Sequence, residues 1–177
     1  MPAPLPTLAV VLCTLIIISD VYARRVPNAC LLAALLLGAG WMLTRLLQGE
    51  AAPIGTALLG LLLGLVVLLP MYAIHWMGAG DVKFFATLGF LLGAKALLPI
   101  WIIGSLLVGV HAVISLISRY WLRHATPGWE VAQTWIAASP VGRRVAQARN
   151  GRHGSPYAAC LAVGAVMTVF TPALVRW

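Results

Sequence analysis

The chain alternates long apolar stretches with short polar breaks, a pattern typical of proteins that cross a membrane several times. A spanning helix needs about 20 mostly apolar residues. Stretches of that kind cover residues 5–23, 27–47, 54–76 and 156–175. The segment "RRVPN" separates the first two, and Pro27 suits the start of a new helix. Ser155 and Pro156 form a start signal for the last stretch.

Residues 84–118 are largely apolar and could form either one long helix or two shorter ones. The basic residues decide between them, because cytoplasmic loops of membrane proteins carry an excess of Lys and Arg. A turn at residues 93–95 gives six spans and places nine of the twelve basic residues on one side. We therefore predict an all-α polytopic membrane protein with about six transmembrane helices. It would form one membrane-embedded domain over residues 1–177, with both termini on the periplasmic side.

The fourth predicted helix, residues 82–93, is too short to cross a bilayer by itself. At 1.5 Å per residue it extends about 18 Å, whereas the hydrocarbon core of a bilayer is about 30 Å thick. One of its ends must therefore lie inside the bilayer or be reached by water. The segment before this helix reads "MGAGDVKF" and carries Asp81 directly after Gly80.

Composition agrees with this pattern, since 62% of the residues are hydrophobic and only 9% are charged. The net charge of +8 would suit a nucleic-acid partner, but the basic residues flank the apolar stretches, as membrane topology requires. We expect no nucleic-acid binding. The three cysteines lie inside apolar stretches without paired spacing, so the sequence predicts neither a disulfide framework nor a metal site, and no cofactor. We expect the first span to be retained, because it lacks the features of a cleaved signal peptide.

The two aspartates of the chain are expected at similar depth near the cytoplasmic boundary. Asp20 ends the first span about one helical turn before Arg24, and Asp81 lies two residues before Lys83. Each alone could cap a helix or pair with a basic neighbour. Together, two close carboxylates share a proton, so that one activates a water while the other donates a hydrogen bond. This is the chemistry of aspartic proteases.

Three segments resemble motifs of the type IV prepilin peptidases, a family of membrane aspartic endopeptidases. "GAGDVK" (residues 78–83) resembles the family's GxGDxK motif, "DVYARRVPN" (20–28) resembles its first-aspartate motif, and "SPYAACLAVGA" (155–165) resembles the start of its last span. The resemblance implies that Asp20 and Asp81 are the catalytic pair. It also implies supporting or substrate-binding roles for the remaining motif residues, Pro27, Asn28, Gly78, Gly80 and Lys83. We expect Gly78 and Gly80 to allow positive φ and close backbone approach.

The resemblance further implies a biological role. The family cleaves the leader peptide of type IV prepilins and pseudopilins, which carry an N-terminal hydrophobic helix, and so supports pilus or type II-like secretion assembly. It acts at the cytoplasmic face of the bacterial inner membrane. This chain is similar to the short, peptidase-only branch found in Flp/Tad pilus systems. We therefore expect neither the zinc module nor the methyltransferase activity of larger members.

Two other functions remain open from the residues. A transporter could use the aspartates as an ion or proton relay, but would place them near the bilayer midplane. A lipoprotein signal peptidase also uses two aspartates, but at the outer face. Residues 119–154 are expected to form an amphipathic, basic cytoplasmic loop that lies on anionic lipid, or alternatively binds the pilus assembly platform. His75 is interpreted as an interface residue and not as a base.

Overall fold

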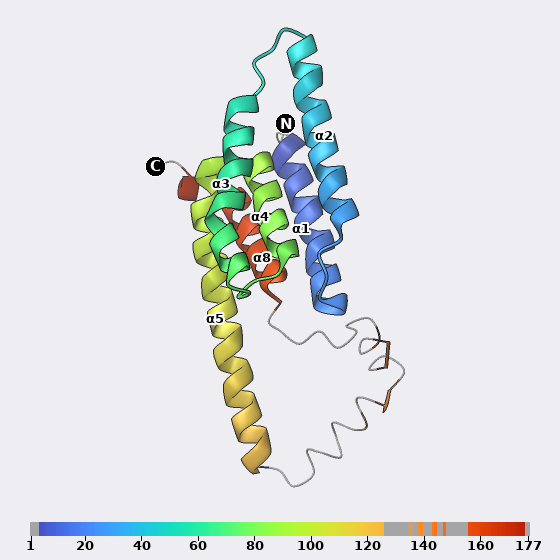
Figure 1. The fold of residues 1–177 in the computed structure, drawn as a ribbon, viewed down its shortest axis with the longest axis vertical. Helices are drawn as coiled ribbons and strands as arrows, with labels where there is room; N and C mark the ends of the chain where they lie inside the picture. The colour runs from blue at the N-terminus through green and yellow to red at the C-terminus, as the bar shows by residue number, and fades with distance from the viewer. Residues whose placement is uncertain are drawn as a thin grey trace.

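The computed structural model describes residues 4–125 and 156–175, together with the positions 135, 138–139, 143–144 and 147. These two long stretches are helical apart from short connections. Their elements are α1 (Pro4–Ala23), α2 (Asn28–Leu47), α3 (Ile54–Ala73), α4 (Ala79–Leu92), α5 (Ala94–Ala125), α8 (Tyr157–Phe170) and the short 3-10 helix η1 (Pro172–Val175). The predicted all-α class is confirmed (Figure 1).

The turn that separates the fourth and fifth predicted helices is present. Gly93 lies between α4 and α5 with a φ of 85°, a conformation that favours glycine. Among the described residues, four helices are long and apolar enough to span a membrane: Pro4–Ala23, Asn28–Leu47, Ile54–Ala73 and Ala94–Ser118. The chain is therefore a membrane protein. The helices α4 and α8 have 14 residues each, which corresponds to about 21 Å.

Several predicted boundaries were wrong. The loop was expected to begin at residue 119, but α5 continues to Ala125 because "RYWLRHA" contains neither Gly nor Pro to stop the helix. The rest of the predicted amphipathic loop lies almost entirely outside the described residues. Pro27 precedes α2 as its N-cap and is not its first residue. The last helix ends at Phe170, since Pro172 disfavours helix at the residue before it.

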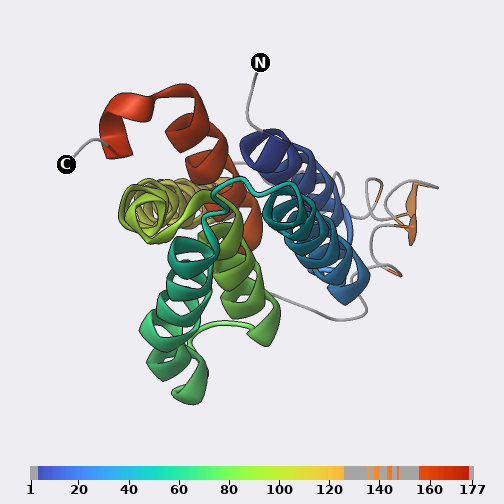
Figure 2. The same ribbon diagram turned by 90° about the horizontal axis from the view of Figure 1, so that it is seen from above.

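Helix α4 is the centre of the bundle. Its residues from Phe84 to Leu91 are all buried, and it contacts α1, α2, α3, α5 and α8 (Figure 2). The outer helices instead expose leucine and valine side chains on the faces turned away from α4, among them Leu36, Leu62 and Val66. Apolar exposure of this kind suits contact with lipid. The short helix is therefore shielded from the bilayer by longer ones.

Glycines allow the helix backbones to approach closely at two contacts. A Cβ at Gly60 of α3 would collide with the carbonyl of Gly89 in α4, and one at Gly64 would lie 2.7 Å from the Cα of Ala86. In the second contact, a Cβ at Gly164 of α8 would lie 2.9 Å from the carbonyl oxygen of Ile100 in α5. Small residues at helix contacts are a common packing device in membranes. They fix how deeply α4 sits against α3 and how α8 sits against α5.

We predict that Gly60→Ala lowers the free energy of unfolding by about 1–3 kcal/mol, because the added methyl forces α3 and α4 apart. Thermal unfolding of the detergent-solubilised protein measures this effect. Gly55→Ala is the matched control, since it lies on the same helix and a Cβ there meets nothing within 4 Å. Equal unfolding temperatures for the two variants would contradict the proposed packing.

Candidate active site

A cavity of about 950 Å³ lies where the C-terminal end of α1 meets the N-terminal ends of α4 and α8. The segment between α1 and α2 forms another part of its wall. All seven residues that the sequence singled out line this cavity: Asp20, Pro27, Asn28, Gly78, Gly80, Asp81 and Lys83. The structure therefore brings together two motifs that are separated by about a third of the chain.

Asp20 is anchored by the first turn of α8. Its side chain is buried, with 6% of the residue exposed, and its Oδ2 accepts a hydrogen bond of 2.9 Å from the backbone N–H of Ala159. The first N–H groups of a helix have no partner within the helix, and they favour a negative charge nearby. The positive charge of Arg24 also acts on Asp20. A carboxylate inside an apolar bundle thus has both a donor and a neighbouring cation.

Asp81 is the third residue of α4, and its carboxylate turns back to the start of its own helix. The Oδ2 atom accepts a hydrogen bond from the N–H of Gly78, at 3.3 Å. This contact caps the helix in the way expected of an acidic residue at that position. The side chain nevertheless lines the cavity and interacts electrostatically with Asp20. Asp81 can therefore cap helix α4 and also interact with Asp20.

The expected positive φ at Gly78 and Gly80 was wrong. Gly78 has φ −76° and an extended backbone, and Gly80 lies within helix α4. In the described part of the chain, the glycines with positive φ are Gly49 and Gly93. Both glycines instead lie close to side chains of the protein itself. A Cβ at Gly78 would lie 3.3 Å from Oδ2 of Asp81, and one at Gly80 would lie 3.0 Å from the Cβ of Val26.

The short connection between α1 and α2 is held in place by local hydrogen bonds. Ser19 Oγ donates to the carbonyl oxygen of Arg25 at 2.8 Å, and Arg24 adopts a positive φ of 52°. Val26 packs over Gly80 at the start of α4. The connection thereby adds Arg24 and Arg25 to the cavity wall. With Lys83 from α4, three basic residues line the cavity that holds the two carboxylates.

Sequence reasoning did not place Tyr157, Ser19, Arg24 or Arg25 in the site, although all four line the cavity. One feature of the sequence could have pointed to Tyr157. It is an aromatic residue with a polar hydroxyl at the start of the last predicted span, on the same side of the membrane as both aspartates. His75 is exposed in the turn after α3 and is not among the described residues that line the cavity. This placement agrees with its interpretation as an interface residue.

The fold and the site define a helical membrane protein with a pair of aspartates in a cavity at one end of its bundle. The model of the type IV leader peptidase family matches residues 7–113, which is more than half of the chain. The chain therefore belongs to the type IV leader peptidase family and is a protease. Both aspartates lie within the matched range, whereas α8 lies outside it. Searches of curated proteins and of solved structures gave no match.

We predict that Gly80→Ala slows leader-peptide cleavage several-fold, roughly 3- to 10-fold, because its methyl pushes Val26 and the cavity wall away from α4. The variant Gly80→Ala/Val26→Gly should recover most of the lost rate, since it removes the Cβ of Val26 that the added methyl would meet. Initial rates of cleavage measure both effects. Gly40→Ala, where a Cβ meets nothing within 4 Å, is the control. Failure of the second substitution to restore any activity would contradict this role for Gly80.

Proposed function

We propose that this chain is a membrane aspartic endopeptidase that removes the leader peptide from type IV prepilins or pseudopilins. It would act at the cytoplasmic face of the bacterial inner membrane, in support of pilus or type II-like secretion assembly. One observation carries the proposal: Asp20 and Asp81 come from different helices, line one cavity and interact electrostatically. Family membership supports leader peptides as the class of substrate.

The chemistry uses the two carboxylates as a coupled pair that shares one proton. The ionised carboxylate takes a proton from a water molecule, whose oxygen attacks the scissile carbonyl carbon. The protonated carboxyl group donates its proton toward the carbonyl oxygen, which gives a neutral tetrahedral diol. Breakdown of the diol cleaves the C–N bond: the carboxyl group that took the proton of water gives it to the leaving amine, and the other carboxylate takes a proton from a diol hydroxyl. Both carboxyl groups thereby return to their starting states.

The cavity is large enough for a peptide segment. Its volume of about 950 Å³ lies at the upper end of the range of roughly 300–1,000 Å³ that is usual for ligand sites. Its walls consist largely of helix ends and of the connection between α1 and α2, where polar groups gather. We infer that the scissile bond enters from the polar end while the hydrophobic helix of the substrate stays among the lipid chains.

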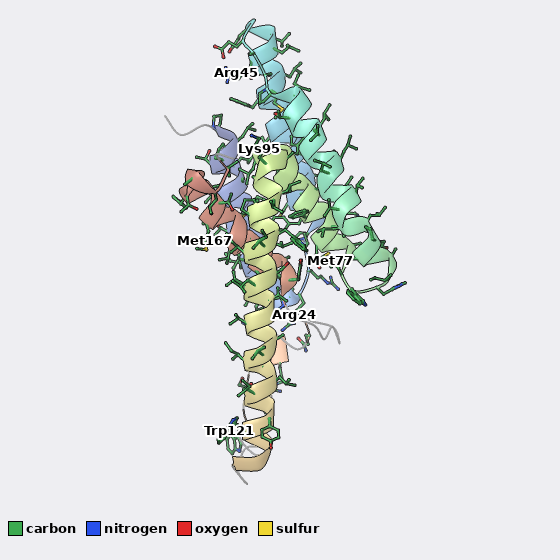
Figure 3. All side chains as sticks on the ribbon, turned by 90° about the vertical axis from the view of Figure 1, so that its left-hand side faces the viewer. Arg24, Arg45, Met77, Lys95, Trp121 and Met167 are labelled. Carbon is green, nitrogen blue, oxygen red and sulfur yellow. The ribbon has the colours of Figure 1, made fainter. Side chains whose placement is uncertain are left out.

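Charge placement supports a cytoplasmic site. Arg24 lies toward the cavity end of the bundle, whereas Arg45 and Lys95 lie toward the opposite end (Figure 3). The greater number of basic residues on the cavity side favours a cytoplasmic orientation, with six spans and both termini on the periplasmic side. The same orientation disfavours a lipoprotein signal peptidase. Family membership also disfavours a transporter. For residues 119–154, binding to anionic lipid or to the assembly platform remains part of the proposal.

We predict that Asp20→Asn and Asp81→Asn each reduce cleavage of a co-expressed prepilin by at least about 100-fold, because neither amide can exchange the required proton. In the Asp20→Asn variant the side-chain amide oxygen can still accept the N–H of Ala159, so this protein should fold and accumulate in the membrane. Immunoblotting of processed and unprocessed prepilin measures the loss.

The matched control for the aspartate variants is Glu50→Gln. Glu50 is an acidic residue in the turn after α2, where it forms a 2.8 Å ion pair with Arg45 away from the cavity. Its replacement should leave cleavage at the wild-type level. An Asp20→Asn or Asp81→Asn protein that is present in the membrane and still cuts would overturn the proposed mechanism.

The proposed orientation predicts which positions react with a thiol reagent that cannot cross the membrane. In a chain whose three native cysteines are replaced by alanine, Ala51→Cys between α2 and α3 should react in cells with a permeabilised outer membrane. Lys83→Cys, an exposed position at the cavity, should react only after the inner membrane is also opened. Mass-tag gel shifts report the labelling. The reverse pattern would place the site on the periplasmic side.

A further inference from the structure

The first turn of α8 brings a phenol to the carboxylate pair. Tyr157 is the first residue of α8 and lines the same cavity as Asp20 and Asp81. Two residues later, the N–H of Ala159 donates to Oδ2 of Asp20 at 2.9 Å. One helical turn therefore both anchors a carboxylate and places a tyrosine in the wall of the cavity that holds the pair. The mechanism described above makes no use of this hydroxyl.

The hydroxyl of Tyr157 is positioned from helix α5. Its oxygen lies 3.5 Å from Oγ of Ser105. One turn earlier on α5, the indole N–H of Trp101 is buried and has no partner of ordinary hydrogen-bond geometry among the described residues. The indole group nevertheless acts on the Tyr157 hydroxyl. Two side chains of α5 with N–H or O–H groups thus face the same oxygen.

The numbers of donors and acceptors around the Tyr157 hydroxyl limit which group donates each hydrogen bond. A phenol hydroxyl has one proton to donate and an oxygen that accepts, whereas an indole N–H can only donate. Either hydroxyl can be the donor in the 3.5 Å contact between Ser105 and Tyr157. When Ser105 donates and the indole N–H of Trp101 approaches the same oxygen, the proton of Tyr157 is left for the cavity. There it meets groups that accept hydrogen bonds, and the charge of Asp81 already interacts with Tyr157. In this arrangement the phenol is a donor that is held in place before substrate enters.

We propose that Tyr157 is a third catalytic residue, whose hydroxyl donates a hydrogen bond to the oxygen of the scissile carbonyl as the tetrahedral intermediate forms. Ser105 and Trp101 are positioning residues that act through this hydroxyl. The inference rests on the proposed function. No bond to Tyr157 forms or breaks, and its proton stays on the phenol. A fixed donor aimed at an oxygen that gains charge stabilises the transition state more than the bound substrate.

Steady-state kinetics with a purified leader-bearing substrate test this role. Tyr157→Phe, which removes only the hydroxyl, should lower kcat by roughly 10- to 100-fold and change KM by less than about twofold. Ser105→Ala should lower kcat by a smaller factor. The variant Tyr157→Phe/Ser105→Ala should be no slower than Tyr157→Phe alone, because the serine acts only through the phenol. Tyr22→Phe, an exposed position on α1 outside the cavity lining, is the matched control.

A second measurement keeps the aromatic ring and the hydroxyl. Replacing Tyr157 with a fluorinated tyrosine makes the phenol more acidic with little change in shape. At a pH where the phenol stays protonated, the more acidic hydroxyl is the stronger hydrogen-bond donor, so kcat should rise from tyrosine to monofluorotyrosine to difluorotyrosine. A phenol that only packs in the cavity wall would leave kcat unchanged across this series. This readout also applies if Tyr157→Phe fails to accumulate in the membrane.

Several results would overturn the inference. They are a wild-type kcat for Tyr157→Phe, a loss that appears mainly in KM, independent losses that multiply in the double variant, or a kcat that does not rise along the fluorotyrosine series. If Asp20→Asn and Asp81→Asn are inactive while Tyr157→Phe cleaves normally, only the role of Tyr157 fails. If the wild-type chain shows no aspartate-dependent cleavage, the proposed function fails and the inference falls with it.

Discussion

The hydrogen bond from the N–H of Ala159 to Asp20 is the interaction on which the site depends. A carboxylate in apolar surroundings is costly unless donors or opposite charges compensate it. Here the donor comes from a residue 139 positions away, at the start of a helix that packs against both α1 and α5. The polar site therefore requires the complete bundle, because α1 alone cannot satisfy its own buried acid.

The position of helix α4 is a second requirement for the site. It lies at the centre of the bundle and begins at the cavity, so that Asp81 reaches the level of Asp20 only if α4 keeps its position along α3. The contacts at Gly60 and Gly64 set that position through backbone approach, which no side chain could replace without moving the helix. The relative placement of the two aspartates thus follows from packing between glycines that do not themselves line the cavity.

Much of this organisation could be predicted from local sequence features. Hydrophobic length gave the spanning helices, the charge bias gave the turn near Gly93, and the motifs gave seven residues that line one cavity. The structural reasons for Gly78 and Gly80 could not be predicted, because they depend on neighbours in space. The same holds for Tyr157, which contacts Ser105, a residue of another helix that lies 52 positions earlier in the chain. Periodicity reports which face of a helix is apolar, but not which side chain it meets.

The length of α5 has a mechanical consequence for the site. From Ser105, which touches Tyr157, the helix continues for 20 more residues to Ala125, or about 30 Å, and extends beyond the rest of the bundle (Figure 1). Ser105 thus connects this long helix to the first turn of α8, the turn that anchors Asp20. A shift of α5 along its own axis would therefore displace Ser105 relative to Tyr157 and would act on the first turn of α8.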